Sequence, residues 1–93
     1  MPTHKSAEKR IRQTEKRRLR NRHVKSRVKS NVRAIREAIE AADAGNTPED
    51  INETLKAATS ALARAVTKGV IPKRRASRKI SRLTRAVNRV TNG

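Results

Sequence analysis

The sequence contains no cysteine and no aromatic residue, and its apolar runs are short. Without cysteine, disulfide bonds and thiolate metal ligands are excluded, and nothing points to an oxidising compartment. Without Phe, Tyr or Trp, the chain cannot stack bases on aromatic rings, as sheet-based RNA modules and single-strand binders do. No segment resembles a signal peptide or a membrane span, so we expect a cytosolic protein.

Size and apolar content allow one small domain. The chain has 93 residues, 33% of them hydrophobic, and apart from Met1 all of these are aliphatic. A chain of this length buries only a modest core, and the aromatic side chains that often dominate core energetics are missing. We therefore expect a single domain over residues 1–93, with low stability in the absence of a partner.

Positive charge dominates the chain and is divided into blocks. There are 25 Lys and Arg against 8 Asp and Glu, for a formal net charge of +17. Residues 1–36 carry a net charge of +12, residues 37–53 hold six acids and no base, and residues 54–93 hold eleven bases and no acid. So large a charge on so small a body calls for a polyanionic partner.

Hydrophobic spacing predicts three helices. Apolar residues recur at intervals of three and four, as in a helix, at Val24, Val28, Val32, Ile35, Ile39 and Ala42. The first helix should cover about residues 5–43 and measure about 58 Å at 1.5 Å per residue. The others should cover about residues 48–68 and 72–91. The predicted fold class is all-α, a three-helix up-down-up bundle whose overlong N-terminal helix projects beyond the core.

Glycine and proline mark the expected helix ends. Gly45 and Gly69 should adopt the positive φ of helix C-caps. Thr47 is predicted as the N-cap of the second helix, with Pro48 at the first helical position. Pro72 should open the third helix.

Bases crowd one another at helical spacing. Like charges four residues apart destabilise a helix, and they recur in the series Arg12–Lys16–Arg20, Arg18–Arg22, Lys25–Lys29, Arg74–Arg78–Arg82 and Arg75–Lys79. Together such pairs cost about 2–4 kcal/mol at low salt. A helix that keeps such repulsion without opposite charges nearby usually does so for its function. The phosphates of a nucleic acid would supply the missing negative charge. Lys73, Arg74 and Arg75 at a helix N-terminus are predicted to cradle a phosphate.

Other chemistry finds little support in the sequence. His4 and His23 are not accompanied by the set of Cys or carboxylate ligands that a metal site needs. A divalent-ion site among the acids of residues 37–53 is imaginable, but helix-terminus charges are the better interpretation, with intramolecular pairs Arg33–Glu37 and Arg36–Glu40. No Ser or Thr has a nucleophile setting, and there is no phosphate-binding glycine loop. We expect no enzyme activity, no metal site, no cofactor and no small-molecule substrate.

Several motifs are those of a known family. They are Lys5-Ser6-Ala7, Lys9-Arg10-Ile11-Arg12, Arg17-Arg18-Leu19-Arg20-Asn21-Arg22, Val24-Lys25-Ser26, Lys68-Gly69-Val70-Ile71, Arg78-Lys79 and Ser81-Arg82-Leu83. Over nearly its whole length the chain resembles protein twenty of the bacterial small ribosomal subunit. After Ile71 the family usually has His-Lys-Asn, whereas this chain has Pro72-Lys73-Arg74.

The resemblance implies a structural constituent of the small ribosomal subunit. Such a protein would bind small-subunit (16S) ribosomal RNA, near its 5′ domain and long decoding-region helix, early in assembly. It would be a monomer within the particle, beside other ribosomal components. The RNA-contacting positions it implies are Lys9, Arg10, Arg12, Arg17, Arg18, Arg20, Arg22, Lys25, Ser26, Lys73, Arg78, Lys79 and Arg82. The basic runs themselves add Lys5, Lys16, Lys29, Arg74 and Arg75.

Two other functions compete with RNA binding. A histone-like DNA-compacting protein would use the same phosphate contacts, but the sequence offers no β-ribbon arms or apolar wedge for base steps. A membrane-active amphipathic helix needs a wide apolar face rich in Trp, Phe or Leu, and these faces are narrow and rich in Ala and Val.

Overall fold

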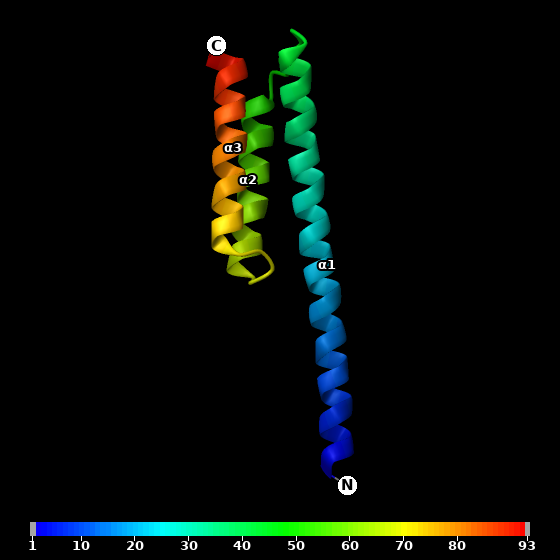
Figure 1. Cartoon of the computed structure of the whole chain (residues 1–93). Coiled ribbons are helices and arrows are strands. Elements are labelled where there is room, and N and C mark those ends of the chain that lie inside the picture. Colours follow the sequence, from blue (N-terminus) through cyan, green and yellow to red (C-terminus); the bar gives the residue numbers. More distant parts are fainter. Residues whose placement is uncertain (1, 93) are drawn as a thin grey trace.

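The computed structural model describes the backbone of residues 2–92 and the side chains of residues 5–91. The described chain forms three helices, α1 (Pro2–Asp43), α2 (Ile51–Thr67) and α3 (Lys73–Asn92), and no strand. It runs along α1, returns along α2 and runs back along α3, so α3 ends beside the end of α1 (Figure 1). The predicted all-α, up-down-up bundle is confirmed.

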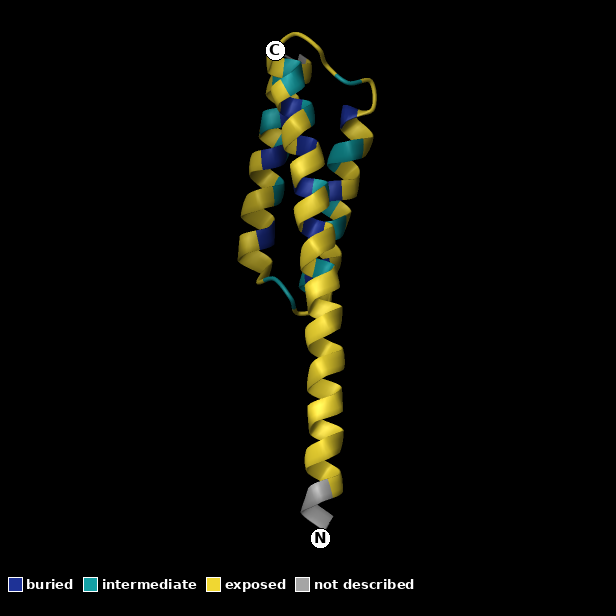
Figure 2. Ribbon diagram, turned by 90° about the vertical axis from the view of Figure 1, so that its right-hand side faces the viewer, coloured by how far each residue is buried: buried dark blue, intermediate teal, exposed yellow. Residues whose placement is uncertain are grey.

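Helix α1 extends far beyond the bundle. It contains 42 residues, against 17 in α2 and 20 in α3, which corresponds to about 63 Å at 1.5 Å per residue. The molecule measures 68 × 21 × 15 Å, so α1 sets its long dimension. Every residue from Lys5 to His23 is exposed, and Figure 2 shows this half of α1 as a rod that leaves the bundle.

The core lies between the second half of α1 and the two shorter helices. All buried side chains in the described chain are apolar. On α1 they follow the predicted stripe, and in full they are Val28, Val32, Ile35, Ile39, Ile51, Ala58, Leu62, Ala65, Ala76, Leu83 and Val87. Because α1 first packs on this core at Val24, packing holds only its second half in place.

Glycines end the first two helices with the same hydrogen-bond pattern. Gly45 has φ +91° and Gly69 has φ +74°, as predicted. The Asn46 amide donates to the Ala41 carbonyl at 2.8 Å, and the Gly45 amide donates to Ala42 at 3.0 Å. After α2, the Val70 and Gly69 amides donate in the same way to Ala65 and Val66, each at 2.9 Å. Both ends are therefore Schellman motifs, in which the left-handed glycine lets two amides satisfy the last carbonyls.

The start of α2 differs from the prediction. The helix begins at Ile51, its N-cap is Asp50, and no side chain caps it, so the predicted Thr47 cap was wrong. The Ile51 amide donates to the Pro48 carbonyl at 3.3 Å. This bond between residues i and i+3 closes a turn over residues 48–51, just before the helix. Ile51 is only 3% exposed and is the first residue after the turn to enter the core. Burial of Ile51 thus decides where α2 begins.

Candidate nucleic-acid interface

All eighteen residues predicted to contact RNA are exposed. Twelve lie on α1, between Lys5 and Lys29, and six lie on α3, between Lys73 and Arg82. The α1 residues occupy the projecting rod and the first turns of α1 inside the bundle. The two groups do not converge on one pocket, so the surface they form is extended.

Bases surround the projecting half of α1. One shallow hollow is lined by Lys5, Lys9, Arg12 and Lys16, together with Glu8 and Gln13. The spacing of four, three and four places the bases on one side of the helix. A second hollow, nearer the bundle, is lined by Arg17, Arg18, Arg22 and Lys25 together with Thr14 and Asn21. A rod with cations on more than one side can contact separate stretches of a polyanion at once.

The first turn of α3 is cationic. The Ala76 amide donates to the Pro72 carbonyl at 3.1 Å, which makes Pro72 the last residue before the helix. Lys73, Arg74 and Arg75 fill the first turn, which contains no acid. Their amides have no backbone carbonyl partner within the described chain. The turn lies at the end of the bundle from which α1 projects (Figure 1).

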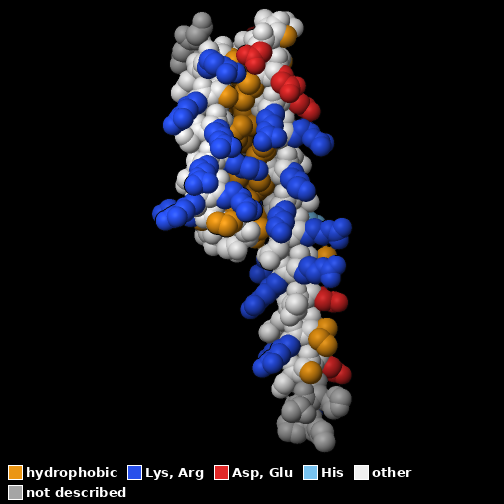
Figure 3. Space-filling model, in the orientation of Figure 1, with side chains coloured by type: hydrophobic (Ala, Val, Ile, Leu, Met, Phe, Trp, Pro, Cys, Tyr) orange, Lys and Arg blue, Asp and Glu red, His pale blue; other side chains and the backbone are white. Residues whose placement is uncertain are grey.

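A third basic surface lies along the bundle. Lys79 and Arg82 of α3 line a hollow with Arg36 of α1, over the apolar side chains of Val32, Ile39, Leu83 and Ala86. Figure 3 shows this apolar seam with Lys and Arg along both sides. The structure therefore places Lys79 and Arg82 beside α1. The hollows of the rod, in contrast, are lined by residues of α1 alone. Glu40 also lines this hollow.

Acids do little to neutralise these bases. In the part of the chain whose side chains are described, one ion pair forms, between Arg89 and Asp43. The interpretation that Arg33 pairs with Glu37 and Arg36 with Glu40 was wrong, because neither pair reaches ion-pair distance there. On the face in Figure 3, acids gather at the end of the bundle opposite the rod, and fewer lie along the rod itself.

The histidines and acids form no recognisable metal centre in the described region. His23 is exposed, and His4 lies outside the described side chains. No group of three or more His, Asp or Glu within that region is placed to hold a metal ion. None of the described helices has an apolar stretch long enough to cross a membrane.

Three cations that line a groove between α1 and α2 were missed by the sequence analysis. They are Arg27, Arg64 and Lys68. Arg64 on α2 and Lys68, the residue directly after α2, are four residues apart, a spacing visible in the sequence. The groove needs Arg27 as well, and its position opposite them depends on the antiparallel packing of α1 on α2.

The fold and its surface define a class: small helical proteins with a dense and extended surface of positive charge. A sequence model of the family described as ribosomal protein S20 matches residues 2–88, so the chain belongs to that family. It is 48% identical to the small ribosomal subunit protein bS20 of Helicobacter acinonychis, over 97% of each chain. It is 50% identical to that of Syntrophus aciditrophicus, over 95% of this chain and 94% of the other. The resemblance seen in the sequence is thereby confirmed.

Proposed function

We propose that this protein is a structural, non-enzymatic component of the small ribosomal subunit that binds 16S ribosomal RNA directly. The single observation that carries the proposal is a long exposed surface of Lys and Arg, on a chain that belongs to the ribosomal protein S20 family. Its relatives bear the name small ribosomal subunit protein. The site of action would be the ribosome in the cytoplasm.

The proposed contacts are the eighteen exposed residues of α1 and α3. Each is a base except Ser26, whose hydroxyl can bond a phosphate between Arg22 and Lys29. In the free protein the bases repel one another along each helix. Phosphates between them replace this repulsion with attraction and release counterions from the RNA. The RNA and the helices would therefore stabilise each other.

The whole chain would act as one RNA-binding domain. The bundle anchors one end of α1, and the rod extends the basic surface well beyond the bundle. A narrow basic rod can lie between RNA segments and neutralise the phosphates on both sides. We expect a monomer within the particle, beside other ribosomal components, holding RNA segments together during assembly.

A competition experiment tests this function. Labelled protein is bound to transcribed 16S RNA, and equal masses of unlabelled 16S RNA and duplex DNA are compared as competitors at one salt concentration. We expect the RNA to compete at least tenfold better than the DNA. Both competitors offer phosphates, but only the folded RNA offers a shape that fits the protein surface. Equal competition would support the alternative, a DNA-compacting protein. No observation favours that alternative, and the described residues form no β-ribbon.

A further inference from the structure

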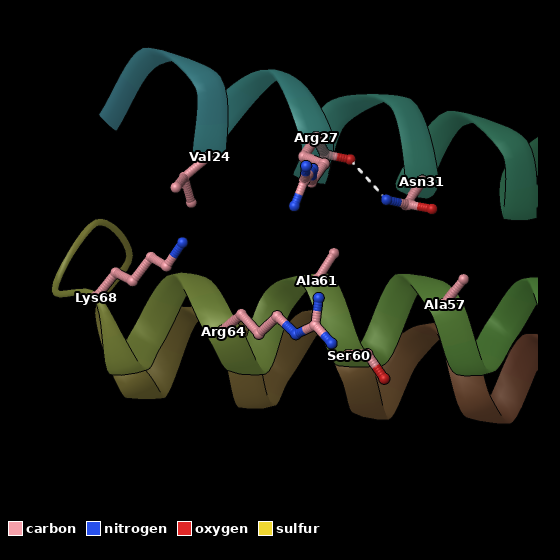
Figure 4. Close-up of a pocket in the computed structure, with 8 residues that line it drawn as sticks. All are labelled: Val24, Arg27, Asn31, Ala57, Ser60, Ala61, Arg64 and Lys68. Atoms are coloured by element: carbon pink, nitrogen blue, oxygen red, sulfur yellow. Dashed lines mark hydrogen bonds between the residues drawn. The ribbon is translucent and has the colours of Figure 1, made fainter. Parts of the chain in front are cut away.

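A groove between α1 and α2 gathers three cations around a floor of small side chains. It encloses about 410 Å³ and is lined by Val24, Arg27 and Asn31 from α1 and by Ala57, Ser60, Ala61, Arg64 and Lys68 from the α2 side. Figure 4 shows Lys68 reaching toward α1, and Arg27 facing α2 across the same space. This groove is separate from the hollows of the rod and of α3.

Small side chains on α2 create the space. Ala58, Leu62 and Ala65 face the core and are completely buried. Ala57 and Ala61 lie beside that stripe and fill little volume where α2 faces α1. On the α1 wall, the Asn31 side-chain amide donates to the Arg27 carbonyl at 2.8 Å, which holds Asn31 against its own helix. The result is a gap wide enough for a chemical group between two packed helices.

No acid among the described residues balances the positive charges of the groove. No acid lines it, and none of its three cations forms an ion pair in the described chain. The negative end of the α2 dipole accounts for cations at Arg64 and Lys68, in and just after the last turn. It does not account for Arg27, which lies in the middle of α1. Three cations on facing helices with no acid among them favour an anion between them.

We propose that this groove binds one phosphodiester group of the RNA, clasped by Arg27 from α1 and, on the opposite side, by Arg64 of α2 and by Lys68 directly after α2. This inference rests on the proposed function, because the RNA supplies the phosphate. Arginine can bond two phosphate oxygens at once, and lysine adds a mobile point charge. The ribose would lie against Ala57 and Ala61. One bound phosphate would thus join α1 to α2 where the rod leaves the bundle.

The first test compares two double variants of equal charge in binding to transcribed 16S RNA. Arg64→Gln/Lys68→Gln removes two groove cations, and Lys56→Gln/Arg85→Gln removes two exposed cations outside the groove. We expect the groove variant to bind at least about tenfold more weakly than the control variant, as lost charged hydrogen bonds predict. Glutamine favours helix nearly as well as the bases it replaces.

The second test locates the phosphate. Phosphates of the RNA are ethylated at random, and the positions where ethylation blocks binding are mapped for the wild type and for Arg27→Gln. We expect the wild type to show a blocking position that disappears in Arg27→Gln and also in Arg64→Gln/Lys68→Gln. If one phosphate is shared, variants on either side of the groove must lose the same blocking position.

The outcomes separate the two proposals. If the wild type fails to prefer 16S RNA over duplex DNA, the proposed function fails. If it prefers the RNA but the groove and control variants bind equally, the clasp alone is overturned. Circular dichroism shows whether Arg64→Gln/Lys68→Gln has merely lost helix. In that case Arg27→Gln decides, because it lies far from either end of α1: an unchanged ethylation map in this variant overturns the clasp.

Discussion

Arg89 near the end of α3 pairs with Asp43 at the end of α1, with 3.7 Å between Nη2 and Oδ2. The pair joins the last helix to the first at the acidic end of the bundle. Its members lie in different charge blocks of the sequence, and no helical spacing relates them. Both side chains remain largely exposed, at 69% for Arg89 and 55% for Asp43.

Removing this ion pair should change stability little. Because solvent screens exposed pairs, Asp43→Asn should lower the free energy of unfolding by about 0.2–1 kcal/mol. Thermal unfolding followed by circular dichroism measures this, with Glu15→Gln as a control that removes an exposed acid far from any helix end and outside any ion pair. A loss of several kcal/mol in Asp43→Asn alone would show that the pair holds α3 in place.

Truncation in the core should be far more damaging than truncation on the rod. Ile35 is fully buried, so Ile35→Ala should cost about 2–5 kcal/mol and disrupt much of the bundle. Leu19 is 56% exposed on the rod, so Leu19→Ala should change stability by about 0.5 kcal/mol or less. Denaturant unfolding of the two variants compares them directly. Equal losses would mean that the rod packs on the bundle in solution.

Position 69 should tolerate a D-amino acid but not an L-amino acid. Its φ of +74° strains an L residue, so Gly69→Ala should destabilise the protein by about 1 kcal/mol. A Cβ built at this position meets nothing within 4 Å, so the loss would come from the backbone and not from a clash. Chemical synthesis with D-alanine at position 69 provides the control and should not destabilise the protein. A similar loss with D-alanine would point to crowding instead.

RNA binding should depend steeply on salt. A protein that meets about eight phosphates of duplex-like RNA should lose affinity with a log–log slope of about −7. Titrations of 16S RNA at several salt concentrations measure the slope. The double variant Arg12→Gln/Lys16→Gln, which removes two cations of the rod, should make it shallower by about 1–2. A wild-type slope shallower than about −3 would contradict an interface of this breadth.

The rod should gain helix on binding RNA. Residues 5–23 have no buried side chain, and their like charges oppose the helix, so this half should fray in the free protein at low salt. Circular dichroism should then show helix content rising when 16S RNA is added. A truncated chain beginning at Val24 serves as the control and should gain less helix. Full helicity of the free protein would contradict coupled folding.

The local features of the fold could be predicted from the sequence. The apolar stripe through Ile35 and the left-handed glycines at 45 and 69 depend on neighbouring residues along one helix, so periodicity and backbone chirality reveal them. Exposure of the rod follows from its shortage of apolar side chains. The start of α2 was misjudged because Thr47-Pro48 satisfies the local rules for a helix start, while burial of Ile51 sets the actual one.

The charge pattern and the helices were thus determined by the sequence itself, and with them the expectation of a polyanionic partner. The tertiary structure decided which charges face one another. Arg27 lies opposite Arg64 and Lys68, and Asp43 meets Arg89, only because the helices pack in one register and one rotation. Core packing sets both, since buried side chains must interdigitate in a single arrangement. No spacing within a single helix encodes that arrangement.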